Sequence, residues 1–234
     1  MSQRKKRLRI FLVLAVAIGL AVLVGLVVLQ LSNRDYLYPS DFLAHVEQVE
    51  QNGVDESVVQ GLGWDLAILG REDEVRRMDF TPKFEGLTST VIPERLELSV
   101  VPWREGLREI AANHRLILIM EDHFVSEHRE WIGGTLETFA AAGFRHYAAE
   151  AIRQSDSTLQ RRGYPSCKTG LYVSEPKFGN TIRRALRLNF QVSGYDFEKS
   201  TADEREEFAA TELAKVFHSD PDAKLVVHAG FAHV

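Results

Sequence analysis

The chain of 234 residues is 45% hydrophobic and 26% charged, a balance typical of a folded protein rather than a disordered one. It carries 28 basic and 33 acidic side chains, and five of the bases stand within the first nine residues. The remainder holds 23 bases against 33 acids, which argues against nucleic acid as a partner of the folded part. Cys167 is the only cysteine, so a disulfide within the chain and a CxxC motif are both excluded.

The N-terminal region has the pattern of a membrane anchor. Residues 10–31 are apolar except for Gln30, and at ~1.5 Å per residue they match the ~30 Å hydrocarbon core of a bilayer. The basic cluster in residues 1–9 favours a cytoplasmic N-terminus. We predict an uncleaved, single-pass signal anchor in the inner (plasma) membrane, with the C-terminal domain outside it. A cleaved export signal, the alternative, gives the same compartment.

Residues 32–99 are predicted to form a linker and a small helical segment. A polar spacer precedes two helix-like patterns, one over 42–51 and one from Glu56 toward Leu69. Residues 72–94 contain charges and helix-breaking residues and indicate mostly loop. No pattern here points to chemistry.

Strands and helices alternate over residues 100–234. Strands are predicted at 115–121, 144–150, 190–195 and 223–228, and helices at 102–112, 126–142, 176–188 and 201–218. The unbroken apolar run from Leu116 to Met120 is typical of a strand buried on both faces. We therefore predict an α/β domain with a parallel or mostly parallel sheet of about four strands flanked by helices.

Ionisable residues follow every predicted strand. Glu121 and His123 follow the first, Glu150 the second, Asp196 the third, and His228 and His233 the fourth. Carboxyl ends of parallel strands share one edge of a sheet, where α/β proteins bind ligands. Because clustered carboxylates repel one another, a cation or a hydrogen-bonded network must offset the cost.

Two kinds of chemistry fit these side chains. Imidazole with carboxylate and without thiolate suits zinc, manganese or iron. Alternatively, a Glu–His pair activates water without a metal. Glu121 and His123, two residues apart in extended chain, point the same way. The sequence lacks the G-x-S-x-G, P-loop, G-x-G-x-x-G and H-E-x-x-H motifs, so the enzyme classes that depend on them are not expected.

The motifs of residues 100–234 resemble a known superfamily. They are Glu121-Asp-His123, His128-Arg129, Ala149-Glu150, Gly163-Tyr-Pro, Gly170-Leu-Tyr, Pro176, Ile182-Arg-Arg-Ala185 and His228-Ala-Gly-Phe-Ala-His233. In order and placement they are similar to the erythromycin esterase-like proteins, the haem-uptake ChaN lipoproteins and the TIKI/TraB metalloproteases. Gly230-Phe-Ala-His233 matches the G-x-x-H motif of that superfamily, whereas Met120 replaces the glycine of the other copy.

This resemblance implies that five residues carry the site: Glu121, His123, Glu150, His228 and His233. We predict Glu121, His123, Glu150 and His233 as catalytic residues and Arg129, His228 and Asp196 as substrate-binding residues. The candidate metal ligands are Glu121, His123, Glu150, His228 and His233. Superfamily members usually continue further, so the resemblance also implies a C-terminally truncated domain over 100–234.

The first functional hypothesis is a membrane-anchored, extracytoplasmic hydrolase, an esterase or metal-dependent peptidase acting on a small molecule or a peptide. The alternative is a haem- or iron-binding uptake module with a histidine as the axial ligand. A third possibility is a degenerate domain without catalysis.

Overall fold

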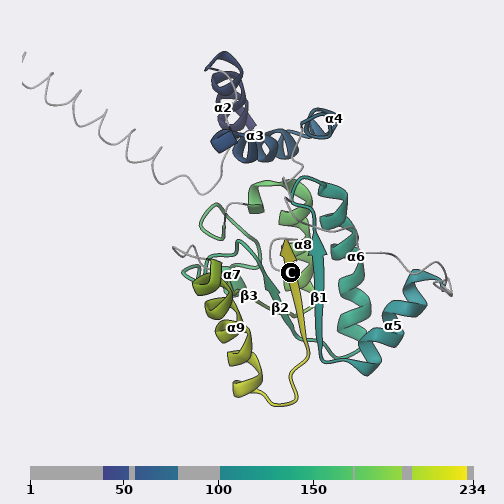
Figure 1. Cartoon of the computed structure of the whole chain (residues 1–234). Coiled ribbons are helices and arrows are strands. Elements are labelled where there is room, and N and C mark those ends of the chain that lie inside the picture. Colours follow the sequence, from purple (N-terminus) through teal and green to yellow (C-terminus); the bar gives the residue numbers. More distant parts are fainter. Residues whose placement is uncertain (1–38, 53–55, 79–100, 171, 197–201, 231–234) are drawn as a thin grey trace, which may run out of the picture. The chain divides into compact units, whose positions relative to one another are not determined.

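The computed structural model describes residues 39–52, 56–78, 101–170, 172–196 and 202–230 (Figure 1). The chain divides into two compact units, residues 1–37 and 38–234, and all described residues belong to the second. The predicted anchor at 10–31 and His233 lie outside this part of the chain. Among the described helices, none combines the length and apolar character that crossing a bilayer requires.

A four-stranded parallel sheet forms the centre of the α/β region. Its strands are β1 (Leu116–Glu121), β2 (His146–Ala149), β3 (Gln191–Gly194) and β4 (Leu225–Gly230), in the spatial order β1-β4-β2-β3. All three pairings are parallel. The predicted α/β class with a parallel sheet flanked by helices is therefore confirmed, and the four strands lie where the apolar runs predict them.

Helices lie on both faces of this sheet (Figure 1), but Leu116, Leu118 and Met120 of β1 are exposed on one of them. The prediction that this run is buried on both faces is therefore wrong. The helices α5 (Trp103–Asn113), α6 (Ser126–Ala141) and α8 (Pro176–Arg187) contribute to one core, and α9 (Ala202–Ser219) packs over the other face. Alternation along the strands assigns side chains to these cores. Tyr147 and Val226 belong to the α6–α8 core, whereas Ala148, Leu225 and Val227 belong to the α9 core.

Local residue chemistry sets the helix ends near the site. Glu175 caps α8, since its carboxylate accepts hydrogen bonds from the backbone N–H groups of Lys177 (2.8 Å) and Phe178 (2.6 Å). Gly143, at φ +90°, follows the end of α6. Ser126 is the first residue of α6, where the predicted helix begins, and its hydroxyl donates to Glu72.

The remaining elements are short or lie before the sheet. The helices α2 (Pro39–Asn52) and α3 (Glu56–Ile68) match the two predicted helical patterns, and α4 (Glu72–Val75) lies in the region predicted as mostly loop. They share a small apolar core of their own. The connection between β2 and α8 contains α7 (Leu159–Arg162) and the 3₁₀ turn η1 (Tyr172–Ser174).

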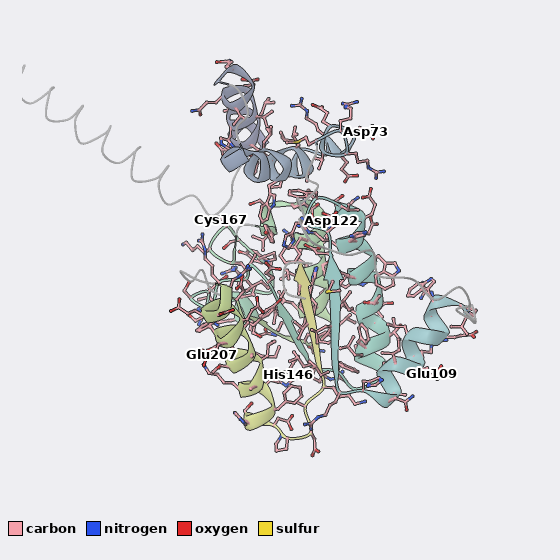
Figure 2. All side chains as sticks on the ribbon, in the orientation of Figure 1. Asp73, Glu109, Asp122, His146, Cys167 and Glu207 are labelled. Atoms are coloured by element: carbon pink, nitrogen blue, oxygen red, sulfur yellow. The ribbon has the colours of Figure 1, made fainter. Side chains whose placement is uncertain are left out.

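Both ends of the sheet carry ionisable side chains, but of different kinds. His146 begins β2 at the amino end of the sheet, whereas Asp122 follows β1 at the carboxyl end (Figure 2). Only the carboxyl end gathers the predicted site residues.

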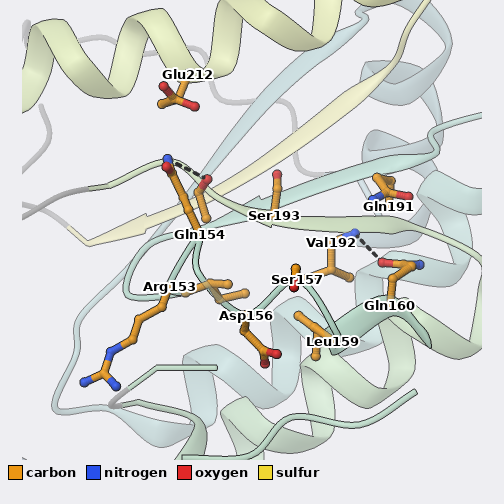
Figure 3. A pocket seen from close by; sticks show the side chains of 12 residues that line it. Arg153, Gln154, Asp156, Ser157, Leu159, Gln160, Gln191, Val192, Ser193 and Glu212 are labelled. Atoms are coloured by element: carbon orange, nitrogen blue, oxygen red, sulfur yellow. Dashed lines mark hydrogen bonds between the residues drawn. The ribbon is translucent and has the colours of Figure 1, made fainter. Parts of the chain in front are cut away.

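A side-chain amide covers part of the β3 edge (Figure 3). Gln160 donates to the carbonyl of Phe190 (2.7 Å) and accepts from the N–H of Val192 (3.1 Å). These are the two bonds that a residue of a neighbouring parallel strand would make, so Gln160 caps an otherwise open edge. A cavity of about 310 Å³ lies beside this edge, and none of the predicted site residues lines it.

Candidate functional site

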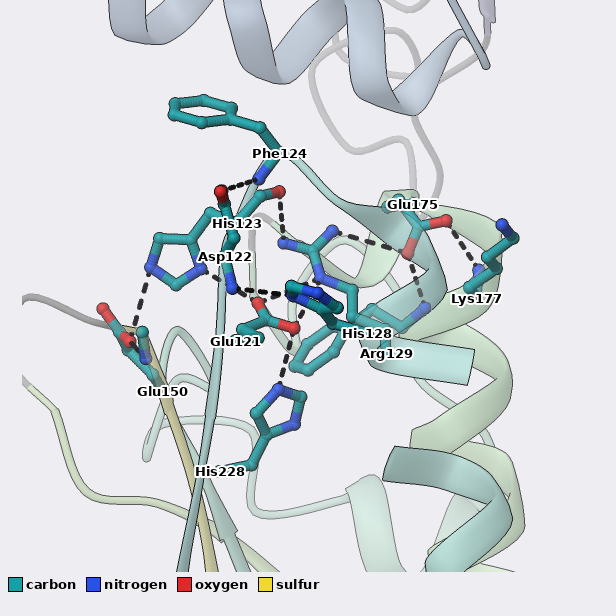
Figure 4. A network of polar contacts seen from close by, with 12 residues as sticks. Glu121, Asp122, His123, Phe124, His128, Arg129, Glu150, Glu175, Lys177 and His228 are labelled. Atoms are coloured by element: carbon teal, nitrogen blue, oxygen red, sulfur yellow. Dashed lines mark hydrogen bonds and ion pairs between the residues drawn. The ribbon is translucent and has the colours of Figure 1, made fainter. Parts of the chain in front are cut away.

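Glu121 is the centre of a buried polar network at the carboxyl end of the sheet (Figure 4). Its side chain is 2% exposed. Arg129 Nε lies 3.0 Å from both carboxylate oxygens, His123 Nδ1 lies 2.9 Å from Oε1, and His228 Nε2 lies 2.8 Å from Oε2. Every oxygen of this buried carboxylate thus has at least two nitrogen partners.

The fold brings these partners together from three elements. Glu121 ends β1 and His123 follows it, and the short connection to α6 places Arg129 in the second turn of that helix, over the strand end. His228 comes from β4, which was predicted to end at this residue. The strand continues to Gly230, so His228 lies opposite Ile119 and Ala149 within the sheet and not beyond its edge.

The charged and hydrogen-bonding groups around Glu121 lower its pKa by more than burial raises it. Burial alone would raise the pKa of this carboxyl, but the hydrogen bonds from His123 and His228 and the charge of Arg129 hold the pKa far below its ordinary value. Glu121 is therefore ionised throughout the physiological range. Its negative charge is the fixed electrostatic feature around which the site is built.

His123 is the member of the network that reaches solvent. Its side chain is 15% exposed, against 2–3% for Glu121, Arg129 and His228. Its Nε2 lies 3.5 Å from Glu150 Oε2, so the imidazole stands between two carboxylates. Burial by itself would lower the pKa of His123, but Glu121 and Glu150 raise it to about 9.

Aromatic rings enclose the imidazole of His123. The ring centroid of Tyr172 lies 4.9 Å from that of His123, and the ring centroid of Trp64 lies 5.7 Å away. Tyr172 is itself buried against Phe178. These apolar walls limit the access of water to His123 and strengthen its interactions with the two carboxylates.

Glu150 follows β2 and is held by two further donors. Its Oε2 accepts from the backbone N–H of Gly230 at 2.6 Å, and its Oε1 accepts from Arg205 Nη2 at 2.9 Å. Arg205 also forms two bonds to Asp196, at 2.8 and 2.7 Å. Asp196, predicted to bind substrate, is thus part of an ion pair that orients Glu150.

The close approach of β4 to His123 requires glycine at position 230. A Cβ at this position would lie 2.5 Å from Cε1 of His123 and 3.0 Å from Oε2 of Glu150. Any larger residue would force the His123–Glu150 pair apart. The glycine of the Gly230-Phe-Ala-His233 motif thus allows β4 to pass close to His123.

Arg129 is more buried than a substrate-binding role would suggest. Besides Glu121, it reaches Glu175 at 3.4 Å and the backbone carbonyl of His123 at 3.0 Å. Its side chain is 3% exposed. Its contacts are those of a buried salt bridge with Glu121 and Glu175.

Two supporting residues were missed by the sequence reasoning. The hydroxyl of Tyr147, within β2, lies 2.6 Å from Nδ1 of His228, and an apolar-looking strand gives no signal of such a contact. Glu175 supports Arg129 and caps α8 at once. Its position just before Pro176, a preferred first residue of helices, was an available signal.

The described residues do not fit the predicted metal-ligand set. Both oxygens of Glu121 already accept from Arg129 and a histidine, and both ring nitrogens of His228 have partners. No group of three His, Cys, Asp or Glu side chains in this part of the chain is arranged to hold an ion. The same contacts leave His228 without a free nitrogen for haem iron. The fifth candidate, His233, lies outside the described residues, so the metal and haem hypotheses stay predictions.

Comparisons with known proteins give distant structural similarities alone. No family model and no curated protein matches the chain. The type III effector HopBA1 is 18% identical with a TM-score of 0.41, over 56% of this chain and 72% of that one. RRSP, a MARTX toxin effector domain from Vibrio vulnificus CMCP6, is 15% identical with a TM-score of 0.44, over 75% and 40%.

A third structure is the C-terminal region of Pasteurella multocida toxin, described as having a thiol-protease-like catalytic triad. It is 14% identical with a TM-score of 0.38, over 82% of this chain and 26% of that one. At TM-scores below 0.5, these similarities do not establish a shared function, and the family of this chain is not shown by them.

Proposed function

We propose that this protein is a hydrolase that cleaves an ester or amide bond with His123 and Glu150 as its acid–base pair. The observation that carries the proposal is the position of His123, which contacts Glu121 on one side and Glu150 on the other and is partly open to solvent. In acid–base catalysis, two neighbouring titratable groups typically have environments that give them different pKa values, so that one donates a proton and the other accepts one.

The division of roles follows from the charges. With a pKa of about 9, His123 is protonated at neutral pH, so it serves as a proton donor. Glu150 has a fixed orientation, because Gly230 and Arg205 each bind one of its oxygens. It serves as the base that accepts a proton from water.

The proposed reaction conserves protons over one cycle. Water attacks the carbonyl carbon while Glu150 takes one of its protons, and the charge that develops on the carbonyl oxygen faces the His123 imidazolium. His123 Nε2 then gives its proton to the leaving oxygen or nitrogen as the carbon–leaving-group bond breaks. The proton on Glu150 passes to His123 across their 3.5 Å contact and restores the starting state.

Glu121 and its buried partners support this pair and do not touch substrate. Arg129 and His228 are each 2% exposed and fully engaged with Glu121 and their outer partners. We assign them the task of holding Glu121, which in turn keeps His123 charged. The substrate-binding roles predicted for Arg129, His228 and Asp196 are replaced in this proposal by positioning roles.

The N-terminal sequence supports the location included in this proposal. The basic residues 1–9 and the apolar run 10–31 favour an anchored protein whose catalytic domain is extracytoplasmic. The motif resemblance to the erythromycin esterase-like, ChaN and TIKI/TraB superfamily supports hydrolysis of an ester or an amide.

A substrate screen with matched variants tests the proposal. The full chain is assayed against chromogenic esters and fluorogenic peptides, beside His123→Gln, Glu150→Gln and Asp122→Asn. Asp122 is the control, since its carboxylate caps Phe124 and does not contact His123. We expect the first two variants to lose activity by at least about 100-fold, and Asp122→Asn to retain it. Hydrolysis that survives in His123→Gln or Glu150→Gln would disprove the assignment.

A further inference from the structure

A chain of buried hydrogen bonds runs from Tyr147 through His228 to Glu121. The Tyr147 hydroxyl lies 2.6 Å from Nδ1 of His228, and Nε2 of His228 lies 2.8 Å from Oε2 of Glu121. Tyr147 is 0% exposed, and the other two residues are 2% exposed. Water therefore has no access to these bonds, and each hydrogen must belong to one of the three side chains.

The inner bond has a fixed direction. Glu121 is an ionised carboxylate, as the three charged or polar groups around it require, and an ionised carboxylate only accepts hydrogen bonds. Nε2 of His228 must therefore carry a hydrogen and donate it. The chemistry of Glu121 thus determines the protonation of Nε2, one of the two ring nitrogens of His228.

The outer bond then decides the state of the other ring nitrogen. Burial raises the pKa of Tyr147 well above its ordinary value, so its hydroxyl keeps its hydrogen. Nδ1 of His228 is the hydrogen-bond acceptor that the described residues offer to this hydroxyl. A hydrogen on Nδ1 would leave the buried hydroxyl without an acceptor, which is unfavourable. Nδ1 is therefore unprotonated.

We propose that Tyr147 is a positioning residue, which fixes His228 as the neutral tautomer with hydrogen on Nε2 and so holds the Glu121 carboxylate toward His123. The effect on rate rests on the proposed function, whereas the tautomer of His228 does not. Tyr147 lies behind the network, on the sheet face packed by α6 and α8, so it does not contact substrate.

The fixed tautomer has a consequence for the placement of charge. A neutral His228 gives Glu121 a hydrogen bond but no positive charge, so Arg129 and His123 are the cationic partners of this carboxylate. His123 is the one of these two that is open to solvent. By keeping His228 neutral, Tyr147 leaves the transferable proton of the network on His123, which lies next to Glu150.

Nitrogen NMR of the imidazole rings in the full chain tests the tautomer directly. With ¹⁵N-labelled histidine, the His228 ring is identified by its proximity to the rings of Tyr147 and Phe178. We expect Nε2 to give the signal of a nitrogen that carries hydrogen and Nδ1 that of an unprotonated nitrogen. The opposite assignment in the wild-type protein would overturn the proposal without any variant.

The variant Tyr147→Phe, with Tyr195→Phe as its matched control, tests whether the Tyr147 hydroxyl determines the tautomer of His228. Tyr195 is also buried and also donates to His228, but to its backbone carbonyl at 3.2 Å. Tyr147→Phe should move the Nδ1 signal of His228, because the donor is gone, and Tyr195→Phe should leave it in place. An unmoved signal in Tyr147→Phe would also overturn the proposal.

Activity measurements distinguish a failure of this inference from a failure of the proposed function. If the protein hydrolyses esters or amides, Tyr147→Phe should lower kcat by about 10- to 100-fold, as is typical of outer hydrogen-bond partners, and leave KM within about twofold. An unchanged kcat in a protein that does hydrolyse them would refute the positioning role. If no substrate is cleaved while the NMR result holds, the proposed function fails and the tautomer assignment stands.

Discussion

His123 Nδ1 lies 2.9 Å from Oε1 of Glu121, and the buried carboxylate turns a side chain that is ordinarily neutral at pH 7.5 into a cation. The contact joins neighbours two residues apart, which the extended chain after β1 directs to the same side. The resulting ion pair is the basis of the predictions that follow.

The proposed hydrolase activity should depend on the protonation of His123. Since its pKa is raised to about 9, we expect kcat to stay level from neutral pH upward and to fall as the pH passes about 9. A pH profile of kcat on the best substrate measures this. A fall centred near the ordinary histidine value of 6.5 would contradict the proposed role of His123 as proton donor.

The same ionisation should make stability depend on pH. The pKa of His123 is higher in the folded state (about 9) than the ordinary value of 6.5 that applies to the unfolded chain. Its stabilising contribution is therefore complete below pH 6.5 and is lost as the pH rises through 9. It amounts to at most about 3 kcal/mol. Urea denaturation at pH 6, 7.5 and 9 should show the decline, and His123→Gln should remove most of it.

Glu121→Gln should damage both the fold and the ionisation of His123. The substitution removes the nearer carboxylate partner of the buried Arg129 and leaves it Glu175 at 3.4 Å, and breaking a buried pair costs about 3–5 kcal/mol. The pKa of His123 should fall toward 6.5, as seen by NMR titration. Glu127→Gln is the control, because Glu127 is half exposed on α6, and it should change neither quantity. A stabilised Glu121→Gln protein would support a degenerate domain.

Gly230→Ala should disrupt the proposed acid–base pair, His123 and Glu150, with little effect on the rest of the sheet. The added methyl would meet His123 and Glu150, so we expect a loss of hydrolysis and a changed His123 ring signal. Gly134→Ala is a matched control in α6, where an added Cβ meets nothing within 4 Å. It should keep full activity and gain about 0.5–1 kcal/mol of stability. Full activity in Gly230→Ala would show that the observed approach of β4 to His123 is not needed.

Arg205 should be coupled energetically to Asp196. Arg205→Met removes the cation between Glu150 and Asp196 and leaves the two carboxylates to repel each other. We expect it to destabilise the protein by about 1–2 kcal/mol, and Asp196→Asn to recover part of that loss in the double variant. A double-mutant cycle by chemical denaturation measures the coupling. Additive effects would show that Asp196 does not share the ion pair in solution.

Much of the fold was determined by residue patterns alone. The apolar runs at 116–120 and 225–227 predict strands, and the alternation with helices predicts a parallel sheet. Burial on both faces holds for β4 alone, because the core under α9 contains no residue of β1, where Leu116, Leu118 and Met120 are exposed. Strand ends mark where ionisable residues gather, so Glu121, His123 and Glu150 could be grouped without coordinates. These predictions succeed because they depend on periodicity and on the shared edge of parallel strands.

The tertiary structure decided how the grouped residues divide into exposed and buried members. The order β1-β4-β2-β3 places β4 beside β1 and β2, and the added length of β4 puts His228 inside the sheet between Glu121 and Tyr147. No sequence pattern indicates such contacts, because their partners are about 80 to 107 residues apart. Burial and charge pairing are properties of the packed sheet, and they alone distinguish the acid–base candidates His123 and Glu150 from the side chains that hold them.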